Sequence, residues 1–592
     1  MRNKPLFLFG FFAFSFYIAS ILLALIDSGF SYRWVSFALW ILAVLILPLY
    51  FAFQRRKKLF ESLQKFFARK QDNYAPLFLV IAALVCSFLY LKEYPFVAIY
   101  DQIRDGGINA QQIADGTFKN IFGYGRYASH GAIIPTITSF FYLIFKNSVF
   151  TFRVPATLLS IFDVLILYAA VRKGVNKHVA FFASLILLVL PLHLYFARTE
   201  VVVMFSGFFT SLIFLLLAFF VKKKEPNMYI LLGLLLGFAS GFHTSIRTVS
   251  LLTIIVISAL TCIAIWRKKL AKVFYAAPLL MVLFYFVGFG PRILYSPPQT
   301  FFQTRSLANA HVTANKIATL ADNYKKSLLV YISQPTTSTH FQEFKPLLPP
   351  VLAIFFILGL LSSIFFGKNI FLRILIFYAF ALPFTNSAIT EAVNSDNRLL
   401  PLLPIAAIFA AYGFYKVLLL VKRYISNTFL LNALQIIFAG YLIFLACTFF
   451  LNEPASKQYT TIDYLSMHAI YFLQKNPEFK SAQTVCVSVA PTNYEYFSLL
   501  HVQEQYQYFL PKKNFLIFQN PDLAINAMAI SKSCSASYQT FSKLVYCNPY
   551  QKFLCPKNET LTLYYQNKFS QTQTAQMPQP SIHIAPTPLT IP

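Results

Sequence analysis

Apolar runs of about 20 residues recur along most of this chain, and they constrain its fold more than any other feature. A helix needs roughly 20 residues to cross a hydrocarbon core of about 30 Å, whereas outer-membrane barrels show short alternating segments. The runs predict spans at about 6–26, 34–54, 76–92, 152–171, 178–197, 202–221, 228–242, 248–266, 274–290, 347–366, 370–386, 399–417 and 429–451. The sequence therefore predicts a polytopic α-helical membrane protein with about 13 crossings.

The chain is strongly basic, with 50 Lys and Arg against 21 Asp and Glu and a formal net charge of +29. Such a charge suggests nucleic acid, but the basic residues form no single surface or tail. They lie in short clusters between apolar runs, at 55–58, 172–173, 222–224, 267–269 and 422–423. Excess Lys and Arg in short loops marks the cytoplasmic side. We therefore expect a multi-pass protein of the cell (plasma) membrane, with the lipid bilayer and no nucleic acid as partner, a cytoplasmic N-terminus and an extracytoplasmic C-terminal domain.

The same alternation predicts the domain organisation. Residues 1–75 form two spans and a basic cytoplasmic loop. Residues 76–451 form the main transmembrane domain, with long outside loops at 93–151 and 291–346. A small α/β domain follows at 452–569, and a disordered tail at 570–592. Strand-like runs at 484–489 and 514–518 support the α/β domain. Four cysteines in that domain permit two disulfides, and they are Cys486, Cys534, Cys547 and Cys555.

One stretch of the membrane domain leaves two readings open. Gly237, Gly241 and the polar run 243–248 interrupt the apolar pattern between the spans at 228–242 and 248–266. Irregular backbone persists at membrane depth only where it is buried in protein or lines a cavity. The stretch is therefore either a turn between two spans or a deep re-entrant turn.

Acidic residues follow the third span, in the outside loop 93–151. Asp101 and Asp105 lie just beyond the predicted helix end. A carboxylate there can take a proton from an attacking hydroxyl or bind a cation, and the same residues also fit a solvated turn with an Asp cap. His130 in this loop, and Arg305 and His340 in the loop 291–346, are weaker candidates for substrate binding.

This loop resembles the N-terminal module of GT-C glycosyltransferases, a group that includes protein O-mannosyltransferases, aminoarabinose transferases and RgtA/B/C/D-like bacterial proteins. The shared order is an outside acidic turn, an interfacial helix, a second short helix over 133–145, and an Arg-x-Pro opening the next span, here Arg153 to Pro155. The family motif is Asp-Glu, an Ala five residues after the Asp, and a later Gly. Asp105, Asn109, Ala110 and Gly116 fit that spacing. Gly106 replaces the Glu, which leaves open whether Asp105 or Asp101 is the family aspartate.

Further segments match the family in the expected order, so that the resemblance covers roughly 76–420. Arg198 and Glu200 follow a stretch similar to the end of the third core helix. The Gly-rich segment 233–241, ending in His243 and Arg247, is similar to the helix that usually follows. Arg398 begins an Arg-x-x-Pro-x-x-Pro element that looks like one late in the family's membrane domain.

The resemblance implies a GT-C fold and a glycosyltransferase that moves a hexosyl or pentosyl group, with inversion, from a polyprenyl-phosphate donor to a hydroxyl of a lipid, glycan or protein outside the cytoplasm. It implies Asp105, or else Asp101, as the base. Arg198, Arg247 and Arg398 are candidates for the donor phosphate, or else membrane-boundary anchors. Glu200 and His243 are candidates for substrate binding. Glu200 either orients the acceptor, pairs with Arg198 or joins Asp105 at a divalent cation.

Two other functions compete with this one. A transporter or flippase for lipid-linked glycans usually shows internal repeats with paired broken helices near the midplane. The sequence has one interrupted segment, near His243, and its polar residues gather at one membrane face, which favours the enzyme. A non-catalytic GT-C-like protein is the second alternative, because the Glu after Asp105 is missing.

Overall fold

The computed structural model describes residues 4–27, 31–54, 70–92, 102–122, 132–199, 201–222, 225–267, 275–295, 316–337, 345–389, 393–424 and 428–451, and short parts of the chain beyond 469. The chain forms two compact units, Met1–Tyr459 and Thr460–Pro592, and each is described by itself. The finer domain boundaries at 75, 451 and 569 remain predictions.

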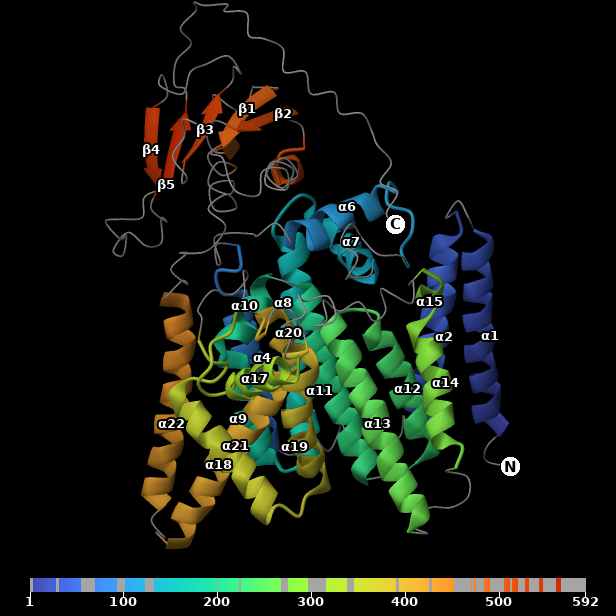
Figure 1. Cartoon of the computed structure of the whole chain (residues 1–592), viewed down its shortest axis with the longest axis vertical. Helices are drawn as coiled ribbons and strands as arrows, with labels where there is room; N and C mark the ends of the chain where they lie inside the picture. The colour runs from blue at the N-terminus through green and yellow to red at the C-terminus, as the bar shows by residue number, and fades with distance from the viewer. Residues whose placement is uncertain are drawn as a thin grey trace, which may run out of the picture. The chain divides into compact units, whose positions relative to one another are not determined.

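The first unit is a bundle of apolar helices (Figure 1). Its main helices are α1 (Lys4–Ile26), α2 (Arg33–Gln54), α4 (Lys70–Phe88), α8 (Phe150–Gly174), α9 (Lys177–Val189), α10 (Pro191–Thr199), α11 (Val201–Lys222), α12 (Pro226–Ser240), α13 (Thr244–Trp266), α14 (Ala277–Phe289), α18 (Pro350–Phe366), α19 (Ile370–Pro383), α21 (Leu402–Tyr424) and α22 (Thr428–Leu451). Within the described ranges, 8 helices are long and apolar enough to cross a membrane, or 9 if the bent pair α9 and α10 counts as one span. Each predicted span coincides with a helix or with that pair. The chain is a multi-pass membrane protein, and the count of 13 crossings remains a prediction.

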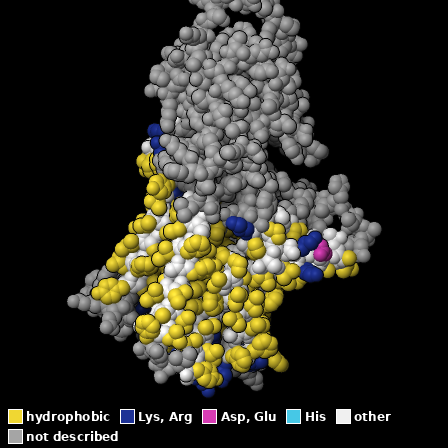
Figure 2. All heavy atoms as spheres, turned by 90° about the vertical axis from the view of Figure 1, so that its left-hand side faces the viewer, with side chains coloured by type: hydrophobic (Ala, Val, Ile, Leu, Met, Phe, Trp, Pro, Cys, Tyr) yellow, Lys and Arg dark blue, Asp and Glu magenta, His cyan; other side chains and the backbone are white. Residues whose placement is uncertain are grey.

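The outer surface of the bundle is apolar. Figure 2 shows hydrophobic side chains over most of the described face turned to the viewer, with few charged side chains among them. On α22, for example, Ile436 and Ile437 are 71% and 67% exposed, whereas Phe438 is buried. A continuous apolar surface of this kind is stable only against lipid or another apolar partner.

Glycines let some helices pack backbone to backbone. A Cβ on Gly359 of α18 would lie 1.9 Å from the Phe409 carbonyl oxygen of α21, and a Cβ on Gly413 would lie 1.9 Å from that of Phe355. Close approach at small residues is typical of helix pairs in membranes, because apolar burial cannot drive their association there.

The predicted span at 178–197 is not one straight helix. It bends by 62° between α9 and α10. Pro191 explains the break, because proline has no amide hydrogen and its ring obstructs the preceding turn. At the other ambiguous stretch, α12 and α13 are separate helices joined by residues 241–243, and the choice between two spans and a re-entrant turn stays open.

Short helical elements lie between the long helices in the chain: η1 (Ile103–Ile108), α6 (Asn109–Ala114), α7 (Ile133–Phe145), α15 (Arg292–Tyr295), α17 (Lys316–Leu329), η3 (Phe384–Ala388) and α20 (Asp396–Leu399). Helices α6 and α7 cross the upper end of the bundle, as expected for an interfacial segment (Figure 1). Gly116 follows α6 with a φ of 77°, a left-handed conformation that favours glycine after a helix end.

The second unit contains a five-stranded sheet in the order β2-β1-β3-β5-β4. Its strands are β1 (Thr484–Val489), β2 (Asn514–Gln519), β3 (Ala527–Ser531), β4 (Ser542–Tyr546) and β5 (Leu561–Tyr565). Strands β1 and β2 pair in parallel and coincide with the two predicted runs, which confirms both. The predicted disulfides stay untested. The structure describes Cys486 only as part of the backbone of β1, and Cys534, Cys547 and Cys555 lie outside the described residues.

Candidate active site

The acidic loop begins with a π-helical turn, η1, which contains Asp105 and runs directly into α6. The Asp105 side chain and the whole of Asp101 lie outside the described part of the chain. Two amide side chains in this segment, Gln102 and Asn109, are each only 2% exposed. Both Gln102 polar atoms and the Asn109 Oδ1 lack a hydrogen-bond partner among the described residues. Buried polar atoms normally have partners, so this segment has hydrogen-bonding capacity for a polar ligand or water.

Gly106 brings η1 against the first turn of α8. A Cβ at position 106 would lie 2.4 Å from the Phe152 Cβ, far closer than side chains approach one another. The Glu of the family motif therefore does not fit at this position unless the backbone moves. Close packing of η1 on α8 is therefore one reason for a glycine at position 106.

Two buried arginines hold the end of α4, from which the acidic loop departs. The Arg153 Nη1 donates to the carbonyl oxygens of Leu91 at 2.9 Å and Lys92 at 3.1 Å. The Arg198 Nη1 donates to the Cys86 oxygen at 2.9 Å, and its Nη2 donates to the Leu89 oxygen. Both guanidinium groups are fully buried. Cations stabilise the carbonyl-rich C-terminus of a helix, so both arginines fix where the loop begins.

The structure thus gives Arg198 contacts with the end of α4, and its role as a donor-phosphate ligand stays a prediction. Its guanidinium also lies 5.0 Å from the centre of the Phe450 ring of α22. These contacts orient it toward backbone carbonyls and an aromatic ring within the bundle.

His243 and Arg247 lie where α12 ends and α13 begins. The His243 Nδ1 accepts a hydrogen bond from the Ser245 amide at 3.3 Å and lies 2.6 Å from the Ser245 Oγ, so the imidazole caps α13. The Arg247 Nε donates to the Ser240 oxygen at 3.1 Å. The sequence placed both residues together correctly, and the structure gives His243 a helix-capping contact.

Asn386 of η3 joins this helix start to α20. Its Nδ2 donates to the Ser245 oxygen at 3.4 Å and to the Arg398 oxygen at 3.3 Å, and its Oδ1 accepts from Thr248. The segments that contain Arg247 and Arg398 are thus tied together through one amide. Nothing in the local sequence pattern distinguishes Asn386 from other polar residues in loops.

Arg292 is the functional candidate that the sequence analysis missed. It lies just after α14 and is fully buried. Tyr285 of α14, Arg247 and Arg292 lie near one another, and a Cβ on Gly241 would lie 3.4 Å from the Arg292 Nη1. Two arginines from different elements therefore approach one phenol where α12 and α14 end and α13 begins. A Pro-Arg pair directly after an apolar run was the signal available in the sequence.

The predicted outside loop 291–346 contributes α17, which is fastened to η3. Ser327 and Ser387 share a hydrogen bond of 2.7 Å, and the Asn323 Nδ2 donates to the Ala388 oxygen at 3.4 Å. Burial raises the pKa of the Tyr324 phenol, which donates to the Phe380 oxygen at 3.2 Å and stays neutral. These contacts fasten α17 to the η3 turn that also contains Asn386.

A cavity of about 400 Å³ opens between α10, α22 and the residues from Ile332 to Pro350, which lead into α18. Its lining is mostly apolar and includes Leu192, Leu347, Leu445 and Phe449, with Lys345 among its polar members. The volume lies within the range of about 300–1,000 Å³ typical of ligand sites.

Several predicted site residues lie outside the structural description, and they are Asp101, His130, Glu200, Arg305 and His340. Among the side chains that the structure does describe, no three His, Cys, Asp or Glu form a group able to hold a metal ion. The divalent cation considered for Asp105 and Glu200 therefore stays a prediction.

Comparison with known proteins gives one match in sequence. Residues 129–295 match the family model described as dolichyl-phosphate-mannose-protein mannosyltransferase. A comparison with curated proteins found no match.

Among solved structures, the archaeal oligosaccharyltransferase AglB from Archaeoglobus fulgidus, in complex with an inhibitory peptide and a dolichol-phosphate, is 11% identical, with a TM-score of 0.46 over 76% of this chain and 65% of that one. ArnT from Cupriavidus metallidurans bound to undecaprenyl phosphate is 15% identical, with a TM-score of 0.40 over 73% of this chain and 75% of that one. This chain thus spans 65% of the length of the archaeal enzyme. The matched region begins after Asp101 and Asp105, within the predicted loop 93–151, and ends just after Arg292. Over residues 129–295, the predicted resemblance to GT-C glycosyltransferases is confirmed by similarity to their mannosyltransferase branch.

Proposed function

We propose that this chain is a membrane glycosyltransferase that moves a hexosyl or pentosyl group from a polyprenyl-phosphate donor to a hydroxyl of a lipid, glycan or protein. The observation that carries the proposal is the match of residues 129–295 to the mannosyltransferase family. That region contains Arg153, Arg198, Arg247 and Arg292, so the match falls on the helices that bring these arginines to the outer end of the bundle.

Arg247 and Arg292 are the proposed ligands of the donor phosphate. When the anomeric C–O bond breaks, the departing phosphate gains negative charge. Guanidinium groups held in place before the reaction stabilise that charge without reorganising, and burial strengthens the interaction. Arg292 is fully buried and Arg247 is partly buried beside the same phenol, which supports this role. Arg398, tied to the same region through Asn386, is the third candidate.

Asp105 is the proposed base, with Asp101 as the alternative. The acceptor oxygen attacks the anomeric carbon while the bond to phosphate breaks, its proton passes to the carboxylate, and polyprenyl phosphate leaves. A single displacement of this kind inverts the anomeric centre. Gln102 and Asn109 are buried, and they lie three residues before and four residues after Asp105 in the chain. They are suited to bind sugar hydroxyls because their amides both donate and accept hydrogen bonds. Glu200 is proposed to orient the acceptor.

The apolar cavity beside α10 and α22 suits part of a lipid-linked substrate. Leucines and Phe449 line it, and it adjoins α10, the helix that contains Arg198. An isoprenoid or acyl chain there would leave its polar end at the outer side of the bundle.

The proposal places the acidic loop outside the cytoplasm, in the plasma membrane, with the N-terminus inside. Cysteines introduced at Asp105 and Lys224 test that orientation by labelling intact cells with an impermeant maleimide. The cysteine at 105 should react and the one at 224 should not. Equal labelling of both would contradict the topology.

The activity is tested with the full chain in lipid nanodiscs and a panel of polyprenyl-phosphate sugars with hydroxyl acceptors. We expect sugar to appear on an acceptor together with free polyprenyl phosphate, and the Arg292→Gln variant to require more donor. In parallel, liposomes with a fluorescent lipid-linked glycan report lipid flipping. Flipping without transfer by the same preparation would support the transporter alternative, and neither activity would support the non-catalytic one.

A further inference from the structure

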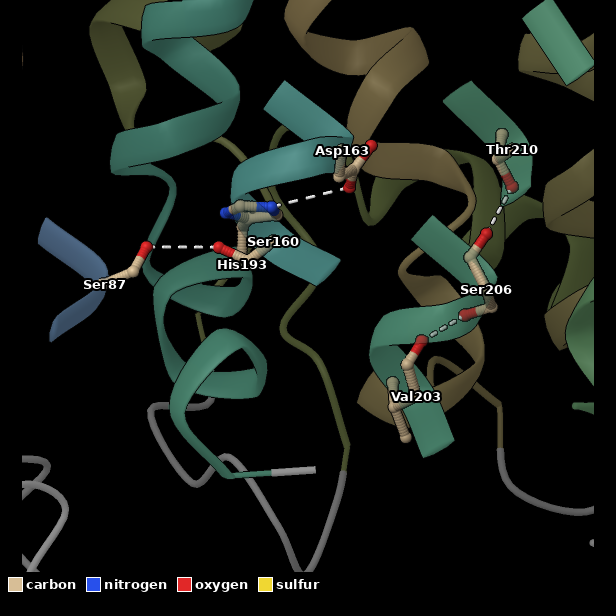
Figure 3. A network of polar contacts seen from close by, with 7 residues as sticks. All are labelled: Ser87, Ser160, Asp163, His193, Val203, Ser206 and Thr210. Atoms are coloured by element: carbon tan, nitrogen blue, oxygen red, sulfur yellow. Dashed lines mark hydrogen bonds and ion pairs between the residues drawn. The ribbon is translucent and has the colours of Figure 1, made fainter. Parts of the chain in front are cut away.

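A carboxylate and an imidazole meet in the middle of the bundle, away from the acidic loop. The His193 Nε2 of α10 lies 3.5 Å from the Asp163 Oδ2 of α8, and the two side chains are 1% and 0% exposed. Figure 3 shows them facing one another from their separate helices. Asp163 lies 13 residues into the 25 residues of α8, about 20 Å along the helix axis. An ionisable residue at that depth is costly, so it needs a specific reason to be there.

The serine and threonine hydroxyl groups near this pair in Figure 3 form hydrogen bonds with other groups, not with Asp163 or His193. The Ser206 Oγ donates to the Val203 oxygen at 2.6 Å, and the Thr210 Oγ1 donates to the Ser206 oxygen at 2.6 Å, both within α11 (Figure 3). Ser87 and Ser160 bond to each other at 3.2 Å. Among the described residues, Asp163 and His193 make no side-chain hydrogen bond, and the 3.5 Å contact between them is the polar contact that the structure gives Asp163.

The surrounding helices close over the pair. A Cβ on Gly207 of α11 would lie 2.9 Å from the Asp163 Oδ2 and 3.6 Å from Leu400, so the α11 backbone packs directly on the carboxylate. Placing a carboxylate next to an imidazole makes their joint burial less costly than the burial of either side chain alone. Loss of either partner leaves an uncompensated polar group in a closed apolar space.

Helix α10 depends on side-chain contacts for its orientation. It has nine residues and follows the 62° bend at Pro191, so no continuous helical hydrogen bonding from α9 fixes its direction. His193 holds its first turn on α8. Its last turn is held by Thr157 of α8, whose Oγ1 donates to the Ala197 oxygen at 3.0 Å, and by Arg198, which donates to the end of α4.

We propose that Asp163 and His193 are positioning residues, which set the orientation of α10 so that Arg198 holds the end of α4 and thereby the start of the acidic loop. The inference rests on the proposed function for its catalytic consequence. The contacts run from Asp163 to His193, along α10 to Arg198, and on to the Cys86 and Leu89 carbonyls. An apolar pair of similar size would fill the same space, but it would not fix α10 through a specific contact.

The experiment compares Asp163→Asn, His193→Gln and the double variant with the full-length parent in nanodiscs. Thr210→Val is the matched control, because Thr210 lies in the same polar region but bonds within α11. Amide hydrogen exchange is measured over residues 86–92, 190–199 and, as a distant reference, α13. Donor KM and kcat are measured on the same samples.

We expect exchange in 86–92 and 190–199 to become at least about tenfold faster in both single variants, with α13 and the control unchanged. Transfer should lose about 100-fold in kcat/KM, the scale expected when a catalytic group moves by about 1 Å. The double variant should lose no more than the worse single variant, because the pair acts as one unit.

Two results would overturn the inference. One is unchanged exchange in 190–199 in both single variants. The other is exchange that rises equally in α13, which would reduce the pair to a general contribution to stability. If the parent transfers no sugar from any donor, the proposed function fails instead, and the exchange measurements still decide the role of the pair.

Discussion

Gly106→Ala tests whether packing, rather than loss of function, explains the missing Glu of the family motif. The added methyl carbon would lie 2.4 Å from the Phe152 Cβ, whereas ordinary contacts begin at 3.4 Å. The η1 turn must therefore move by 1.0 Å, or α8 must give way by the same amount. Forcing an extra group into a packed site costs about 1–3 kcal/mol.

The same displacement moves the backbone of Asp105, which lies next to Gly106 in η1. A misplacement of about 1 Å lowers rates by about 100-fold, so kcat should fall by that factor while donor KM changes little. Gly106→Glu, which restores the Asp-Glu pair of the family, should be less active still, since its side chain is larger. Initial transfer rates in nanodiscs and thermal unfolding in detergent measure both effects.

Gly440→Ala is the matched control, because a Cβ at that position of α22 meets nothing within 4 Å. We expect it to leave the rate unchanged and to stabilise the helix slightly, by up to about 1 kcal/mol. If Gly106→Ala behaves like Gly440→Ala, the packing argument is wrong. If Gly106→Glu raises the transfer rate, the site tolerates the Glu and the substitution at 106 reflects lost activity.

The remaining predictions concern the arginine cluster and the helix packing. Arg292→Gln should raise donor KM by about 10- to 100-fold with little change in melting temperature, as expected for a charged hydrogen bond of about 1.5–3 kcal/mol, and an unchanged KM would remove it from the phosphate site. Asn386→Ala should lower thermal stability by about 1–3 kcal/mol, because it strands the Ser245 and Arg398 carbonyl oxygens, and equal melting curves would contradict that role. Gly359→Ala should sharply reduce the yield of folded protein on size exclusion, since its Cβ would lie 1.9 Å from the Phe409 oxygen, and a normal yield would disprove the close crossing.

Most of the membrane architecture was predictable because apolar length alone decides which segments can cross a bilayer. The positions of α8, α11 and α13 follow from their runs, and the strand-like runs at 484–489 and 514–518 are indeed β1 and β2. The bend before α10 was signalled by Pro191, yet its angle depends on how α10 packs on α8 and α4, which is set by tertiary contacts.

The site was harder to predict because the sequence does not show which way a side chain turns. Arg198 was a candidate for the donor phosphate or a membrane-boundary anchor, and its bonds to carbonyls at the end of α4 could not be read from the sequence. Arg292 was overlooked, because its importance comes from Tyr285 and Arg247 on neighbouring elements rather than from a motif. Asn386 lies in a π-helical turn that no local pattern announces. The shared feature is contact between elements distant in sequence.

The central claim is that the acidic loop provides the base for glycosyl transfer, and the most direct test compares Asp105→Asn with Asp101→Asn. Both are isosteric and remove one carboxylate each. With a saturating polyprenyl-phosphate sugar that the parent protein uses, release of polyprenyl phosphate should fall by about 10²- to 10⁴-fold in Asp105→Asn, the range for loss of a general base, and much less in Asp101→Asn. Release at the parental rate in both variants would contradict the account.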